Sequence, residues 1–316
     1  MSKKIKIYVT GCSGFIGSQI VHDLKKKGYE VIGICRKNIS KLKKELKIKI
    51  IKSDLISNKD LILNNADALI HCASPNDIVS KNFNLGMNLS LLGTKKLLDA
   101  ASNAKIKKFI YFSSAKVYGY DLKGFIDETS ALKCDNNYAL NHFFGEQLCR
   151  IFSKYSNLNI TVVRPSNVYG VPIISTVNRL SLVPFCFIED AINLGIINIQ
   201  SSGKQIRNFI STQELSFAII NIIENFQSNF NIYNLGSNTY YKIGEIAVLV
   251  ANSFKLILNK NIKINFNSED PKRSNKFEFK SKFFSHKYQT KSPKENMLHV
   301  IETLINRKKK ILIVKK

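Results

Sequence analysis

The chain has 316 residues, of which 44% are hydrophobic, and carries a formal net charge of +25 at pH 7. This composition allows one large core or two modest ones, and it excludes a low-complexity chain and any membrane span of roughly 20 apolar residues. Lysine, isoleucine and asparagine are abundant throughout, so the charge reflects chain-wide composition. No basic stretch interleaved with aromatic residues indicates a nucleic-acid partner.

Short apolar runs alternate with stretches of helical length through the first half of the chain. The runs that predict strands are 4–11, 29–35, 48–54, 68–74, 107–114 and 159–166. Between them, 15–28 and 90–104 have the length and composition of helices. This alternation is typical of βαβ units and predicts an α/β fold with a Rossmann-type, doubly wound parallel sheet. The strands are rich in Ile and Val, as expected for strands buried on both faces.

The alternation weakens in the second half, where polar stretches such as 201–212 read as irregular. We therefore expect a dinucleotide-binding Rossmann domain over 1–168, rejoined by about 208–235. A smaller C-terminal substrate-binding region is expected from 169–207 and 236–316. Ligands of open α/β sheets bind at the carboxyl ends of the strands, so this second region is expected to contact substrate.

Three glycines follow the first predicted strand in the sequence TGCSGFIGS, at Gly11, Gly14 and Gly17. The first glycine permits a tight turn, and the second lets a pyrophosphate approach backbone amides at a helix N-terminus. The third allows close packing of helix on strand. Because strand, glycines, helix and second strand occur in this order, the pattern predicts dinucleotide binding.

The second predicted strand ends without the acidic residue that holds the ribose hydroxyls of NAD. Cys35 takes that place, and Arg36 and Lys37 follow, an arrangement suited to a 2′-phosphate. This favours NADP over NAD. Asp54 ends the third strand and is either an adenine contact or an ordinary turn aspartate. The expected cofactor-binding residues are Gly11, Ser13, Gly14, Phe15, Ile16, Gly17, Arg36, Lys37, Asp54, Leu55 and Ala73.

The six cysteines are scattered, with no CxxC pair and no Cys/His grouping of zinc-site spacing. This pattern predicts reduced thiols, a cytoplasmic protein and no metal site.

Several motifs together resemble one known family. They are TGCSGFIG, IHCAS, LLGTKKLLDAA, FSSAKVYG, FGE, RPSNVYG and, more loosely, IRNFIST and YNLGS. The chain resembles the extended short-chain dehydrogenase/reductases of the NAD-dependent epimerase/dehydratase group over most of its length. The resemblance implies a nicotinamide cofactor on the glycine loop, a nucleotide-sugar substrate oxidised transiently at a ring carbon, and a homodimer.

Ser114 and Tyr138 match the family's catalytic hydroxyl partner and base. A proton must leave the substrate hydroxyl as hydride passes to nicotinamide, and a phenol of unperturbed pKa about 10 is a poor base near neutrality. The family lowers that pKa with a lysine four residues after the tyrosine.

His142 stands at the position of that lysine and is the chain's main departure from the family pattern. An imidazole of unperturbed pKa about 6.5 is mostly neutral at pH 7, although it can still donate a hydrogen bond to the ribose. Three alternatives follow: a differently tuned enzyme, a site where another cation such as Lys116 substitutes, or a non-catalytic NADP-binding sensor or regulator.

The substrate-binding residues implied by the resemblance are Asn167 at the cleft wall and Arg207 and Arg273 on the nucleotide diphosphate. Guanidinium groups suit phosphate oxygens, but these arginines could equally be exposed to solvent. His71 ends the fourth predicted strand and is expected to pack, and Ser90 replaces a family asparagine. The leading hypothesis is an NAD(P)-dependent nucleotide-sugar epimerase, dehydratase or reductase.

Overall fold

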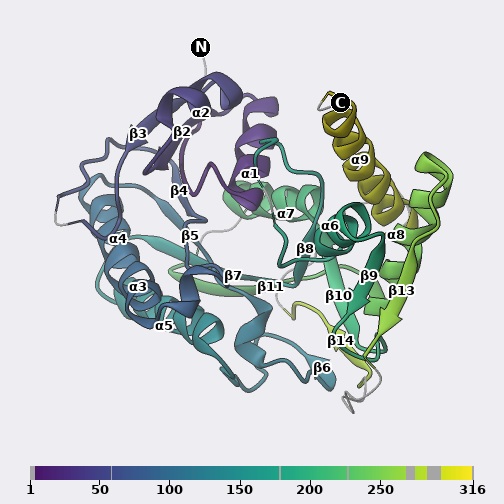
Figure 1. Ribbon diagram of the computed structural model, residues 1–316. Coiled ribbons are helices and arrows are strands. Elements are labelled where there is room, and N and C mark those ends of the chain that lie inside the picture. Colours follow the sequence, from purple (N-terminus) through teal and green to yellow (C-terminus); the bar gives the residue numbers. More distant parts are fainter. Residues whose placement is uncertain are drawn as a thin grey trace.

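The computed structural model describes residues 4–57, 59–177, 179–225, 228–267, 275–282 and 293–314, with the side chains of the last segment described over 295–309. Arg273 lies outside these residues. The main architectural feature is a seven-stranded sheet with helices on both faces (Figure 1). This arrangement confirms the predicted α/β fold with a Rossmann-type sheet.

All neighbouring strands of the large sheet run parallel. In spatial order they are β11 (Phe230–Leu235), β7 (Asn159–Pro165), β5 (Lys108–Phe112), β4 (Ala68–His71), β1 (Lys6–Thr10), β2 (Glu30–Cys35) and β3 (Lys49–Lys52). Each of the six predicted strands forms inside its predicted range. The strand order reverses direction between β1 and β4, which creates the crevice where such sheets bind ligands.

Helices cover the two faces of this sheet separately (Figure 1). One face carries α1 (Phe15–Lys26), α2 (Ile39–Leu46) and α7 (Thr212–Asn225), and the other carries α3 (Phe83–Asn88), α4 (Thr94–Asn103) and α5 (Asn137–Ser153). Alternate residues of β1 face opposite cores: Ile7 and Val9 pack in one, and Tyr8 packs in the other. This explains why the strands are apolar at nearly every position.

The predicted helix 90–104 divides into two parts. Leu89–Gly93 forms a π-helical turn, η2, and α4 continues from Thr94 to Asn103. In this turn Ser90 donates a hydrogen bond to the backbone carbonyl of Asn141 in α5. Short π-helical segments often occur near functional sites, and this one contacts the helix that carries Tyr138 and His142.

Smaller elements lie beside the carboxyl end of the sheet. They include the three-stranded sheet of β8 (Asn167–Tyr169), β10 (Ile206–Ser211) and β12 (Thr239–Lys242), and the pairs β9 (Ile196–Ile199) with β13 (Lys263–Phe266) and β6 (Gly124–Ile126) with β14 (Phe277–Phe279). The stretch 201–212, expected to be irregular, therefore contains strand β10. Its backbone groups pair with β8 and β12, which are distant in sequence.

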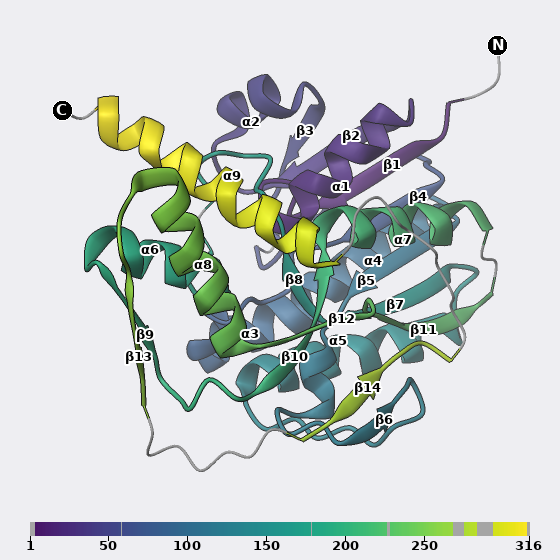
Figure 2. The ribbon, with the colours of Figure 1, turned by 90° about the vertical axis from the view of Figure 1, so that its right-hand side faces the viewer.

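Three further helices accompany these strands: α6 (Phe185–Asn193), α8 (Ile243–Leu258) and α9 (Pro293–Val314). Figure 2 shows them gathered on one side, beside β9 and β13, with the strands of the large sheet on the other. The division of the chain into two domains at the boundaries expected from sequence stays a prediction. No helix in the described part of the chain has the length and apolar character needed to cross a membrane.

Candidate active site

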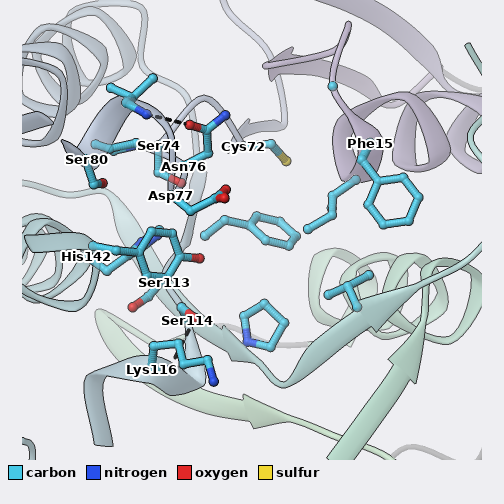
Figure 3. Close-up of a pocket in the computed structure, with 18 of the residues that line it drawn as sticks. Phe15, Cys72, Ser74, Asn76, Asp77, Ser80, Ser113, Ser114, Lys116 and His142 are labelled. Atoms are coloured by element: carbon cyan, nitrogen blue, oxygen red, sulfur yellow. Dashed lines mark hydrogen bonds between the residues drawn. The ribbon is translucent and has the colours of Figure 1, made fainter. Parts of the chain in front are cut away.

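A cavity of about 960 Å³ opens at the crevice between β1 and β4. It extends from the glycine loop to the loop after β5 and on to β10. Figure 3 shows Phe15 and Cys72 toward one end, and Ser114 and Lys116 toward the other. Every site residue predicted from sequence that lies in the described part of the chain lines this cavity, except Lys37, which is exposed to solvent.

The glycine loop has the backbone geometry that its sequence predicts. Gly11 has φ of +64°, and a Cβ there would lie 2.8 Å from the backbone of Cys72. A Cβ on Gly17 would lie 2.3 Å from the Gly11 carbonyl oxygen. Gly14 caps α1 without a side chain, and the first turn contains no acidic residue. The helix N-terminus therefore presents free amides to the cavity, which fits a dinucleotide pyrophosphate.

The adenosine end of the cavity lies beyond β2 and β3. Cys35 ends β2 and is buried, while Arg36 is exposed and lines the cavity. The Asp54 side chain lines the cavity as well, and its Oδ1 accepts a hydrogen bond of 3.2 Å from the amide of Ile56. Asp54 therefore caps a local turn, and its position also suits a contact with adenine.

Tyr138 lies in the first turn of α5, where the Asn136 side chain caps the helix by accepting a 3.0 Å hydrogen bond from the amide of Ala139. The tyrosine is half-buried at the cavity wall. Ser114 ends the loop after β5 and begins the 3-10 turn η3 (Ala115–Tyr118). Burial raises the pKa of Tyr138, and a hydrogen bond with the Ser114 hydroxyl partly opposes that rise. The two hydroxyl groups thus face the same part of the cavity.

His142 lies one turn after Tyr138, with the two ring centroids 4.6 Å apart and the ring planes at 71°. Its side chain is 2% exposed, and burial lowers its pKa to about 4. Among the described residues, neither ring nitrogen makes a hydrogen bond of ordinary geometry. The nearby backbone carbonyls of Phe112 and Pro75 raise the pKa of His142 and so oppose part of the effect of burial. The imidazole is therefore neutral near pH 7 and cannot supply the charge of a lysine.

Arg179 supplies positive charge near Tyr138, and no motif in the sequence singles it out. It lies in the loop between β8 and α6, lines the cavity, and lowers the pKa of Tyr138. Its Nη2 lies 3.6 Å from Oδ1 of Asp77. The negative charge of Asp77 raises the pKa of Tyr138, whereas the positive charge of Arg179 lowers it. Figure 3 shows the Asp77 carboxylate pointing into the cavity. These two residues have no sequence signal because they come from separate, irregular loops.

Lys116 lies in η3, and its surroundings differ from those of Tyr138. Its Nζ lies 4.3 Å from the centroid of the Tyr120 ring. Burial lowers its pKa to about 7, and the positive charge of Arg207 contributes to the shift. Lys116 therefore interacts with Tyr120 and Arg207, whereas the cation that acts on Tyr138 is Arg179.

A buried ion pair supports the segments that carry Ser114 and Tyr138. Arg164 of β7 donates to both carboxylate oxygens of Glu146 in α5, at 2.9 Å and 2.6 Å, and both side chains are almost completely buried. The same arginine donates to the Tyr118 hydroxyl at 2.7 Å, and the Ser113 hydroxyl donates to Glu146. These bonds join α5, β7, η3 and the end of β5 into one rigid support.

His71 is fully buried and has hydroxyl partners on both ring nitrogens. Nδ1 lies 2.8 Å from the Thr10 hydroxyl, and Nε2 lies 3.2 Å from the Thr94 hydroxyl. Burial lowers the pKa of His71 to about 3. This environment agrees with a packing role for the residue, between the glycine-loop strand and α4.

Two of the three predicted substrate-binding residues lie at the far end of the cavity. Asn167 donates a 2.8 Å hydrogen bond from Nδ2 to the backbone carbonyl of Asn208, which ties β8 to β10. Arg207 is half-buried on β10, and burial lowers its pKa. The third residue, Arg273, is not among the described residues.

The chain belongs to the NAD dependent epimerase/dehydratase family, whose sequence model matches residues 7–236. One relative is dTDP-4-dehydro-6-deoxy-D-allose reductase of Streptomyces bikiniensis, 26% identical over 238 residues that cover 69% of this chain and 72% of the relative. The relatives include nucleotide-sugar reductases, dehydratases and decarboxylases.

Solved structures of similar fold cover nearly the whole chain. MoeE5 in complex with UDP-glucose and NAD superposes with a TM-score of 0.78 at 18% identity, over 97% of this chain and 99% of that one. UDP-glucuronic acid 4-epimerase from Bacillus cereus, solved with UDP-glucuronic acid and NAD, gives 0.76 at 22% identity, over 95% and 100%. At these identities the likeness establishes a shared fold.

Proposed function

We propose that the protein is an NAD(P)-dependent enzyme that modifies a nucleotide sugar through transient hydride transfer, as an epimerase, a dehydratase or a reductase. The observation that carries this proposal is the position of Ser114 and Tyr138, whose hydroxyl groups face one cavity that also includes the glycine loop. Related proteins act on nucleotide sugars, and the similar solved structures contain NAD, which supports this reading.

In the proposed mechanism, Ser114 and Tyr138 bind the reacting sugar hydroxyl between them. Tyr138 in its deprotonated form accepts the hydroxyl proton, and the Ser114 hydroxyl orients the substrate oxygen by a hydrogen bond. When bound, the nicotinamide cofactor supplies the acceptor for the hydride that leaves the same carbon. The cavity is closed on one side by α5, whose position is fixed by the Glu146 ion pair.

His142 would orient the reacting groups without supplying charge. Its ring packs edge-on against Tyr138 and limits the rotation of the phenol. Among the described residues, no group holds its ring nitrogens in ordinary hydrogen-bond geometry, so a neutral imidazole at this position could donate one hydrogen bond to the cofactor ribose. The charge that favours the tyrosinate would come from Arg179.

We also propose that NADP is preferred over NAD. Cys35 cannot accept hydrogen bonds from the ribose hydroxyls as a carboxylate does, and Arg36 lines the adenosine end of the cavity. The similar solved structures contain NAD, so NAD is the competing cofactor. Titration of NADPH and NADH by nucleotide fluorescence tests the proposal, and equal or tighter binding of NADH contradicts it.

A second candidate function is a cofactor-binding sensor or regulator that no longer catalyses a reaction. The neutral, buried His142 favours it, since the family's lysine charge is absent from that position. Binding of the cofactor without conversion of any nucleotide sugar, even after long incubation, is the outcome expected of such a protein. Homodimer formation and cytoplasmic location stay predictions from the sequence.

The substitution Tyr138→Phe tests the proposed enzyme directly. The variant should lose turnover by roughly a thousandfold or more, because a positioned acid–base group commonly contributes a factor of that order. Cofactor affinity should stay within a few-fold of the wild type. Tyr155→Phe, at an 85% exposed tyrosine after α5, is the matched control and should be fully active. Full activity of Tyr138→Phe contradicts the assignment.

A further inference from the structure

The cavity contains a half-buried lysine, Lys116, that no acidic side chain in the described part of the chain neutralises. Within the described residues, Lys116 forms no ion pair, and its Nζ lies 4.3 Å from the centroid of the Tyr120 ring. Some exposed lysines have carboxylate partners, for example Lys95 with Asp99 at 2.7 Å. Burying an unpaired cation costs free energy, which the lowered pKa of about 7 at Lys116 reflects.

The charged groups around Lys116 add positive charge to this part of the cavity. Arg207 faces it from β10 and, in the described residues, forms no ion pair of its own. Asp121, on the loop after η3, raises the pKa of Arg207 by its negative charge, and it is exposed to solvent. The described acidic residues that line the cavity are Asp54, which caps a turn at the adenosine end, and Asp77, which pairs with Arg179. Among the described residues, no carboxylate that lines the cavity pairs with Lys116, so a ligand is the candidate source of an anion there.

The position of Lys116 indicates which part of the ligand carries that anion. Lys116 follows Ser114 by two residues, and its backbone amide donates a 3.2 Å hydrogen bond to the Ser114 hydroxyl oxygen. Figure 3 shows the two side chains adjacent, at the end of the cavity away from Phe15 and Cys72. A sugar whose hydroxyl lies between Ser114 and Tyr138 would place its neighbouring ring substituents at Lys116. Arg207, on a different strand, remains available for the diphosphate.

We propose that Lys116 binds a carboxylate group on the sugar, so that the substrate is a nucleotide sugar of the uronic acid class. This inference rests on the nucleotide-sugar function proposed above. A neutral hydroxymethyl group would leave the cation unpaired, whereas a carboxylate compensates its burial by a charge-assisted hydrogen bond. The lysine thus selects for substrate charge beside the reacting carbon.

Isothermal titration calorimetry with cofactor present tests this selectivity. The affinity for UDP-glucuronic acid is compared with that for UDP-glucose, and the corresponding dTDP-sugars are compared in the same way. The wild type should bind the acid sugar at least about tenfold more tightly than the neutral one, since a desolvated charge pair discriminates by that order. Lys116→Met should remove this preference and change the affinity for the neutral sugar less than about threefold. Lys123→Met, at an exposed lysine of the following loop, controls for net charge.

Proton uptake gives a second, independent readout. Because the pKa of Lys116 is about 7 in the free protein, binding of a carboxylate at pH 8 should raise it and take up a proton. The binding enthalpy of the acid sugar should then depend on the ionisation enthalpy of the buffer, and that of the neutral sugar should not. Lys116→Arg should keep the preference for the acid sugar and lose the proton uptake.

Three results would overturn the proposal. Equal losses of affinity for both sugars in Lys116→Met would assign the lysine to the diphosphate. An unchanged preference in that variant would mean that Lys116 does not contact the ligand. Failure of every nucleotide sugar to bind the wild type, with cofactor bound, would contradict the proposed function itself, and the uronate proposal would fall with it.

Discussion

Tyr138 and His142 lie one helical turn apart on α5 with their ring centroids 4.6 Å apart, and the histidine is held neutral by burial. The tyrosine's pKa is raised, chiefly by burial, and the cation that opposes this rise is Arg179. A base of raised pKa is mostly protonated near neutrality, so its activity depends on pH. Charges placed near Tyr138 should therefore shift the pH dependence of the reaction.

Replacing His142 by lysine should increase activity near neutral pH. A cation within about 6 Å of a phenol lowers its pKa by roughly one to three units. The acidic limb of the kcat/KM profile, along which the rate rises as Tyr138 loses its proton, should shift to lower pH by a similar amount, which raises the rate at pH 7 roughly tenfold or more. His142→Gln, which adds no charge, is the matched control. Lower activity of His142→Lys at every pH, in a folded protein that binds cofactor, would contradict the assigned role of Tyr138.

Arg179→Gln and Asp77→Asn should shift the same profile in opposite directions. Loss of the arginine removes a charge that lowers the pKa of Tyr138, so the profile should move to higher pH. Loss of the aspartate removes a charge that raises it, so the profile should move to lower pH. Arg179→Lys should stay close to wild type. Shifts of equal sign in Arg179→Gln and Asp77→Asn would exclude an electrostatic role for the pair.

Acid should destabilise the folded protein partly through His142. The pKa of its side chain falls from 6.5 in the unfolded chain to about 4 in the folded one, so protons bind preferentially to the unfolded state. Stability should be unaffected above pH 7, fall as the pH drops below 6.5, and stop falling below about 4. Between pH 7 and 5 this amounts to about 2 kcal/mol.

Urea denaturation at pH 7 and pH 5 checks this prediction. His142→Gln should lose about 2 kcal/mol less than the wild type over this interval. The remaining sensitivity would include His71, whose pKa is lowered to about 3 by the same cause. Equal losses in the variant and the wild type would mean that His142 is not buried in the neutral form.

The sequence predicted the strands and the glycine loop because each depends on local pattern. The family resemblance selected Ser114 and Tyr138, which both line the cavity. Buried parallel strands are continuous apolar runs, and the loop requires glycine where a Cβ would collide with backbone. The Arg179 and Asp77 pair was missed because its members lie far apart in sequence, within irregular loops. The low pKa of His142 was also not predictable, since it depends on burial beside residues distant in the chain.

The Glu146 and Arg164 pair should be a major contributor to stability in the support of the active site. Removing one partner leaves a buried charge unpaired, so Glu146→Gln or Arg164→Met should each cost about 3–5 kcal/mol in the free energy of unfolding. The double variant should cost less than the sum, because it leaves neither charge buried alone. Lys95→Ala, in an exposed pair, should cost less than about 1 kcal/mol. Additive costs in the urea double-mutant cycle would exclude the coupling.

The proposed conversion of a nucleotide sugar with a nicotinamide cofactor can be measured directly. The most direct measurement is incubation of the purified protein with NADP or NAD and a panel of UDP- and dTDP-sugars, acidic and neutral, with products followed by NMR. We predict a new sugar product whose formation requires Tyr138. Bound cofactor with no product from any sugar would contradict the proposed enzyme and favour the non-catalytic cofactor-binding protein.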